Sequence, residues 1–116
     1  MKIYVKNQIK ALHQWVDAEG AVEFLKYPHR HIFHIVTHVD VKHDDREVEF
    51  FTIQSQIDAI LEAWKRESSL KTSCEQLGLY VLGALQQLYP NRFMTCDVSE
   101  DNENGAVVST EDLNNR

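Results

Sequence analysis

The fold is decided by residues 29–43, which read HRHIFHIVTHVDVKH. Apolar side chains occupy alternate positions along this stretch, and a period of two predicts a β-strand. His29 and His31 follow the same period as Phe33 and Ile35. Because side chains two residues apart in a strand point to the same side, both imidazoles are expected on the apolar face.

A second alternating stretch, residues 2–15, lies earlier in the chain, and His13 ends its apolar series. The apolar members of that series are Ile3, Val5, Ile9 and Ala11. Antiparallel pairing, with partner positions summing to about 42–44, aligns the ends of the two strands and places His13 opposite His29 and His31. Opposed side chains lie about 4.5–5.5 Å apart at Cβ. Three imidazoles are then close enough to bind one ion at Zn–N distances of about 2.0–2.1 Å.

Three histidine ligands with an open fourth position are typical of a catalytic zinc ion. A histidine-rich strand that binds no metal would show the same spacing. The residues by themselves leave both interpretations open.

The apolar period changes after this pair of strands. Helical spacing over residues 50–66 predicts a helix with a core stripe of Phe50, Ile57 and Trp64. Residues 72–75 match the S/T-x-x-E capping box, which predicts the start of a second helix that ends before Pro90. Two further strands are predicted over residues 93–100 and 106–109, joined by a turn at residues 101–105.

This order of elements predicts an α+β fold, ββααββ, with a four-stranded antiparallel sheet and two helices on one face. Residues 1–110 are predicted to form a single domain, and residues 111–116 a polar, frayed C-terminal tail. Residues 16–28 form a long excursion between strands, of the kind that often carries function. Because such a sheet has two open edge strands, pairing between subunits could close several sheets into a barrel.

Composition narrows the possible partners. The 116 residues carry a net charge of −6. This charge argues against nucleic acid as the main partner, because phosphate backbones are bound by clustered Lys and Arg. No apolar run reaches the length of about 18 residues that a membrane span needs, and the N-terminal residues do not resemble a signal peptide. Two cysteines form no disulfide framework. We therefore expect a cytoplasmic protein with reduced thiols that binds neither nucleic acid nor membrane.

Five short motifs, in order, resemble the family of 6-pyruvoyl-tetrahydropterin synthase and 6-carboxytetrahydropterin synthase. The resemblance covers about residues 2–110, nearly the whole chain. The motifs are Ala11-Leu12-His13, His29-Arg30-His31, Glu49-Phe50, Ser73-Cys74-Glu75-Gln76, and Val98-Ser99-Glu100 with Asn104-Gly105-Ala106. This family has the tunnelling fold, whose order of elements is ββααββ and whose subunits assemble into barrels as trimers and hexamers.

The resemblance implies roles for individual residues. His13, His29 and His31 match the zinc ligands of the family. Glu100 matches the acid that binds the 2-amino-4-oxo edge of a pterin, and a carboxylate suits such an edge because it can accept two hydrogen bonds from adjacent N–H groups. Ser73 matches a position that contacts substrate. The implied ligand is therefore a pterin-like or guanine-like heterocycle.

The chain also departs from the family. The catalytic Cys that precedes the H-x-H motif is missing from residues 24–27, and the Asp-His pair between the helices is missing from residues 63–68. Cys74, near a helix N-terminus where a thiol pKa tends to fall, is a weak candidate for the lost nucleophile, and a buried helix-face cysteine is the favoured interpretation. Glu75 is a second catalytic candidate, with the capping box as its structural explanation.

Two functions follow from this pattern. The resemblance implies a zinc-dependent lyase that acts on a reduced pterin such as dihydroneopterin triphosphate. Proton transfer would then come from loop residues, with Glu23, Tyr27, Lys65 and Glu67 as candidates. The missing catalytic residues support an alternative, a non-catalytic zinc-containing module that binds a pterin or purine or serves as a subunit of an assembly. In a third possibility, zinc only stabilises the sheet.

Overall fold

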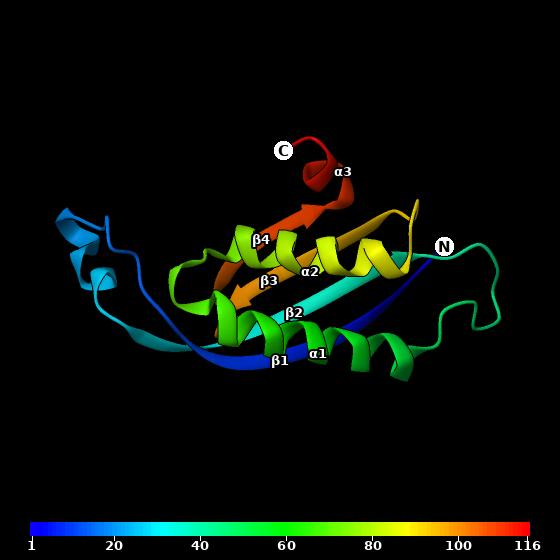
Figure 1. Cartoon of the computed structure of the whole chain (residues 1–116), viewed down its shortest axis with the longest axis horizontal. Helices are drawn as coiled ribbons and strands as arrows, with labels where there is room; N and C mark the ends of the chain where they lie inside the picture. Colours follow the sequence, from blue (N-terminus) through cyan, green and yellow to red (C-terminus); the bar gives the residue numbers. More distant parts are fainter.

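The structure, a computed structural model, describes the backbone of residues 1–116 and every side chain except that of Ser69. Four strands form one antiparallel sheet in the order β1-β2-β3-β4 (Figure 1). The strands are β1 (Lys2–His13), β2 (His29–Asp40), β3 (Met94–Glu100) and β4 (Asn104–Ser109). The helices are α1 (Phe50–Glu67), α2 (Cys74–Leu88) and α3 (Thr110–Asn114), with short 3-10 segments η1 (Gly20–Lys26) and η2 (Ser69–Lys71). The predicted α+β class and ββααββ order are confirmed.

The register of β1 on β2 matches the predicted one. His13 pairs directly with His29, and Ala11 pairs with His31. On the other side of β2, Phe33 pairs with Glu100 of β3. These pairings bring His13, the two histidines of β2 and Glu100 to the same end of the sheet.

Both long helices cover the same face of the sheet, as Figure 1 shows. α1 packs on β1, and α2 packs on β3 and β4. The core between helices and sheet is apolar because each strand turns alternate side chains toward the helices. Its largest fully buried members include Phe33, Ile35, Trp64, Leu82 and Met94.

Two expectations about the helices are wrong. Phe50 was expected in the core, but its side chain is 56% exposed because it is the first residue of α1, while Ile57 and Trp64 are buried. The capping box of α2 lies one residue later than predicted. The Ser73 hydroxyl accepts a hydrogen bond from the Gln76 N–H, and the Gln76 side chain accepts one from the Ser73 N–H.

The two segments expected to be irregular are partly helical. The excursion over residues 16–28 contains η1. The chain end was expected to fray, but Thr110–Asn114 forms the short helix α3, which starts with a capping box between Ser109 and Asp112 and packs against α2. None of the helices described is both long enough and apolar enough to span a membrane.

Candidate metal and ring-binding site

Three imidazoles meet where β1 ends and β2 begins. The ring centroids of His29 and His31 lie 4.7 Å apart, those of His13 and His29 5.3 Å apart, and those of His13 and His31 6.1 Å apart. Three imidazoles bound tetrahedrally to one zinc ion have centroids about 5 Å apart, given Zn–N distances of about 2.0–2.1 Å. The predicted ligands are thus neighbours at close to the separation that a shared ion requires.

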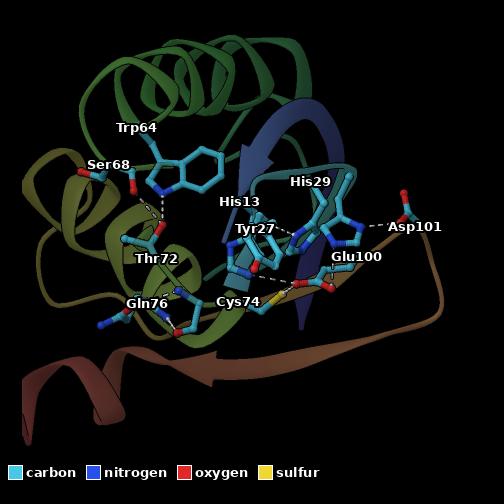
Figure 2. A network of polar contacts seen from close by, with 12 residues as sticks. His13, Tyr27, His29, Trp64, Ser68, Thr72, Cys74, Gln76, Glu100 and Asp101 are labelled. Atoms are coloured by element: carbon cyan, nitrogen blue, oxygen red, sulfur yellow. Dashed lines mark hydrogen bonds and ion pairs between the residues drawn. The ribbon is translucent and has the colours of Figure 1, made fainter. Parts of the chain in front are cut away.

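Two of the rings are oriented by hydrogen bonds on their Nδ1 atoms. His29 Nδ1 lies 2.8 Å from the carbonyl oxygen of Tyr27, and His31 Nδ1 lies 2.7 Å from Oδ2 of Asp101 (Figure 2). Both partners can only accept, so in the neutral form of each ring Nδ1 carries the proton and Nε2 has the lone pair. Metal-binding histidines are commonly oriented in this way.

Buried polar atoms without partners mark the same place. Nδ1 of His13, Nε2 of His29 and Nε2 of His31 are all buried and have no hydrogen-bond partner. Buried polar atoms normally have partners, since leaving one unpaired costs about 1–3 kcal/mol. A cation bound between the rings would supply the missing interactions, so these residues fit a zinc ion in kind and number.

The donor atoms do not yet converge on one point. In the part of the chain whose side chains are described, no three or more His, Cys, Asp or Glu groups are arranged closely enough to hold a metal ion. Binding of an ion at this site would therefore require the imidazoles to rotate. The site is a set of neighbouring ligands rather than a finished coordination shell.

Glu100 extends from the end of β3 toward the histidines. Its Oε1 lies 3.8 Å from His13 Nε2, and its Oε2 lies 3.5 Å from His31 Nε2. Its side chain is 25% exposed, which leaves part of the carboxylate open to a ligand. The carboxylate predicted to hold a heterocycle thus lies beside the predicted metal ligands, as Figure 2 shows.

A pocket of about 710 Å³ opens next to Glu100. This volume falls in the usual range for small-molecule sites. Five of the predicted site residues line it, namely His13, Ser73, Cys74, Glu75 and Glu100. The N-terminal turn of α2 therefore forms one wall, and Ser73, which caps that helix, faces the same space as Glu100.

Cys74 is buried, as the favoured interpretation of a helix-face cysteine predicted. The alternative, a thiol whose pKa is lowered by the helix N-terminus, is wrong, because burial and the nearby Glu100 carboxylate raise the pKa of this thiol to about 12. Its Sγ lies 3.7 Å from Glu100 Oε1 and can donate a hydrogen bond to it. Desolvation and a neighbouring anion both disfavour the thiolate. Together they outweigh the stabilisation of the thiolate by the helix N-terminus. Cys74 is therefore protonated at neutral pH and is a poor nucleophile.

Glu75 lines the pocket but does not cap its helix. The residue expected to begin the capping box, Thr72, has another role. Its hydroxyl accepts a hydrogen bond from the Trp64 indole N–H at 2.9 Å and donates one to the Ser68 carbonyl at 3.1 Å. These bonds fix the segment that leads into the pocket wall.

His13 is held neutral by its surroundings. Burial lowers its pKa below 6.5, the Glu100 carboxylate opposes this, and the two neighbouring histidines lower it further. A neutral imidazole is the form that binds a metal ion.

The residues considered for proton transfer lie outside this pocket, and not all of them are loop residues as expected, because Lys65 and Glu67 belong to the last turn of α1. Among the described side chains, none of Glu23, Tyr27, Lys65 and Glu67 is part of its lining. Glu23 is 61% exposed and forms an ion pair with Lys26. Glu67 accepts a hydrogen bond from the Tyr80 hydroxyl. Tyr27 contributes through its backbone carbonyl, which orients His29.

Sequence reasoning missed several residues of the site, and three of them carry a charge or a large aromatic surface. Asp101 contacts His31, while Trp15 and Lys71 line the pocket. Trp15 is 49% exposed and Lys71 lies in η2, so each comes from a connection rather than from a periodic element. Only Asp101 could have been suspected from the sequence, because it directly follows Glu100, the predicted ring-binding acid, at a predicted strand end.

Comparisons with protein-family models and with curated proteins find no match to this chain. The resemblance to the tetrahydropterin synthases therefore stays a prediction that depends on the motifs and on the geometry described above.

Proposed function

We propose that this chain is a zinc protein similar to 6-pyruvoyl- and 6-carboxytetrahydropterin synthases, and that it acts as a lyase on a reduced pterin. His13, His29 and His31 would hold the zinc ion, and Glu100 would hold the heterocycle. The observation that carries the proposal is the set of three buried imidazole nitrogens that make no hydrogen bond, beside a half-buried carboxylate at one end of the sheet. A zinc ion bound there supplies Lewis acidity to oxygen atoms of the ligand.

The protein groups around the pocket suit a flat, polar ring. The two oxygens of Glu100 can accept hydrogen bonds from adjacent N–H groups of a pterin or guanine, a charge-assisted pair that is stronger than neutral hydrogen bonds. Trp15 lies in the wall of the same pocket and offers a large aromatic surface. Lys71 adds one positive charge to the lining, which suits an anionic substituent on the ligand.

A second candidate function is a binding module without catalysis. The raised pKa of Cys74 favours it, because the one thiol in the pocket is not a ready nucleophile. The outward position of Glu23, paired with Lys26, favours it as well. Such a module would bind zinc and a heterocycle through the same residues and release the ligand unchanged.

We also propose that several copies assemble edge to edge into a barrel of the tunnelling-fold type, as a trimer or hexamer. β1 and β4 are the open edges of the sheet. Exposed apolar side chains on these two strands, Tyr4, Leu12 and Val107, support burial of this region against other copies.

Ring binding is tested by calorimetric titration of the zinc-loaded protein with neopterin, guanine and adenine. Adenine is the control ligand because it lacks the 2-amino-4-oxo edge. We expect neopterin or guanine to bind and Glu100→Gln to weaken this binding by about 10–100-fold, since a charged hydrogen-bond partner is worth about 1.5–3 kcal/mol. Glu62→Gln, at an exposed position of α1 outside the pocket, is the matched control and should bind normally. Equal binding by wild type and Glu100→Gln would contradict the proposed role of Glu100.

Catalysis is tested on the same samples with dihydroneopterin triphosphate, with zinc content measured for each. Product formation in proportion to bound zinc supports the lyase. Binding without any product supports the binding module instead.

A further inference from the structure

The imidazole of His31 lies between two carboxylates that are consecutive in the chain. Glu100 Oε2 lies 3.5 Å from its Nε2, and Asp101 Oδ2 lies 2.7 Å from its Nδ1. The function proposed above uses Glu100 and gives no role to Asp101. The short distance to Asp101 makes this the closest side-chain contact of any of the three histidines.

Asp101 is itself held firmly at the end of β3. Its Oδ1 accepts a hydrogen bond from the Ile32 N–H at 2.9 Å, and its own N–H donates to the Ile32 carbonyl at 2.8 Å. Its backbone φ is 54°, in the left-handed region, which Asp and Asn adopt more readily than other residues that carry a side chain. The two hydrogen bonds with Ile32 hold this turn residue in place and fix the carboxylate against His31.

We propose that Asp101 is a positioning residue for the metal site, an inference that rests on the proposed zinc binding by His31. The carboxylate accepts the Nδ1–H of His31 and thereby keeps the proton on Nδ1. In the neutral ring the lone pair is then on Nε2, a buried atom that makes no hydrogen bond. Carboxylates that orient metal-binding histidines in this way raise metal affinity by fixing the tautomer and the ring position.

The position of Asp101 is specific to one of the two histidines of β2. His29 is oriented by the Tyr27 backbone carbonyl, which no substitution of a side chain removes. His31 depends on the side chain of Asp101. A single substitution at Asp101 can therefore change the tautomer of one ligand and leave the other two in place.

The test compares Asp101→Asn and Asp101→Ala, with Asp97→Asn as matched control at an exposed position of β3, the strand that Asp101 follows. An Asn side chain that keeps its oxygen on the Ile32 N–H turns its NH₂ toward His31 Nδ1. That NH₂ donates, so the ring must carry its proton on Nε2, which blocks metal binding. An Ala side chain permits either tautomer.

We expect zinc affinity, measured by competition with a chelator, to fall by about 10–100-fold in Asp101→Asn and by less in Asp101→Ala. Stability in the absence of zinc should follow the opposite order, because Asn tolerates the left-handed φ better than Ala. Side-chain ¹⁵N NMR of zinc-free protein should show the His31 proton on Nδ1 in wild type and on Nε2 in Asp101→Asn. A merely structural role of Asp101 would leave the tautomer unchanged and make Ala the worse variant for zinc.

The inference and the proposed function can fail separately. If wild type binds zinc and Asp101→Asn binds it with undiminished affinity, the inference is overturned and the zinc site stands. If wild type and Asp97→Asn both fail to bind zinc, the proposed function is contradicted, and the role of Asp101 in metal binding with it.

Discussion

At the scale of single residues, the environment decides which side chains are available for chemistry. Cys74 and His13 both contact Glu100, yet their pKa values shift in opposite directions. Burial, with the carboxylate, raises the pKa of the thiol to about 12, and burial lowers the pKa of the imidazole even though the carboxylate opposes this. The result is a neutral thiol beside a neutral histidine. The residue type at position 74 is that of a nucleophile, whereas its surroundings are those of a core cysteine.

Cys74 should therefore react slowly with alkylating reagents. A pKa of about 12, compared with the ordinary 9.0, lowers the thiolate fraction by about 1,000-fold near neutral pH. Alkylation of native protein by iodoacetamide, mapped to Cys74 by mass spectrometry, should be slower by a large factor than alkylation of the urea-unfolded chain. Reaction of native Cys74 at the rate of the unfolded chain would show that its thiol is activated.

At the scale of elements, strand periodicity and register could be predicted from the sequence, whereas boundaries set by caps and turns could not. The pairing of His13 with His29 followed from the alternation of two long strands alone. The cap of α2 was missed by one residue because Thr72 and Ser73 both begin a plausible capping box. The contact of Asp101 with His31 depends on a turn conformation, which no hydrophobic pattern encodes.

The β3–β4 connection is tested by a pair of glycine substitutions. A Cβ on Gly105 would lie 1.8 Å from the Val98 carbonyl oxygen, so Gly105→Ala must displace the backbone beside Glu100. A Cβ on Gly83, inside α2, would meet only Leu113 at 3.9 Å. We expect Gly105→Ala to destabilise the protein by about 2 kcal/mol or more. Gly83→Ala should stabilise it by about 0.5–1 kcal/mol. Urea unfolding measures both, and equal stability of the two variants would contradict this account of the hairpin.

The segment between β2 and α1 is held by an ion pair whose effect depends on pH. Glu47 Oε1 lies 2.6 Å from Arg92 Nη1 and accepts the Lys42 N–H at 2.9 Å. Arg92, with that N–H, lowers the pKa of Glu47 below its ordinary 4.5. The unfolded chain thus binds the proton more readily, so the stabilisation is present above pH 4.5 and is lost as the pH falls through the folded pKa.

Glu47→Gln should therefore reduce stability at neutral pH and flatten its decline below pH 4.5. Glu62→Gln, at an exposed position on α1, is the control and should leave the dependence of stability on pH unchanged. Thermal unfolding between pH 3 and pH 7 measures the effect. An identical acid decline in wild type and Glu47→Gln would exclude a contribution from this ion pair.

At the scale of the whole molecule, the sheet presents one covered face and one open face with two free edges. The fold class and the order of elements could be predicted because each element has a clear period, and both are confirmed. The association of subunits could not be read from one chain, since edge pairing depends on the shape and charge of two copies. The exposed Tyr4, Leu12 and Val107 belong to this open region.

The purified protein should have the mass of a trimer or hexamer in sedimentation experiments at micromolar concentration. Replacement of Leu12 by Lys, on an edge strand and 54% exposed, should shift the mass toward the monomer without unfolding it. Glu62→Lys, at an exposed position of α1, serves as a control for the added charge. A wild-type monomer at all concentrations would contradict the proposed barrel.

The most direct measurement is the number of zinc ions bound per chain, determined by elemental analysis and chelator competition on wild type and on His31→Ala. The account predicts one zinc per chain in wild type and a large loss of affinity when this one imidazole is removed. Wild-type protein that binds no zinc, or His31→Ala that binds it as tightly as wild type, would contradict the central claim.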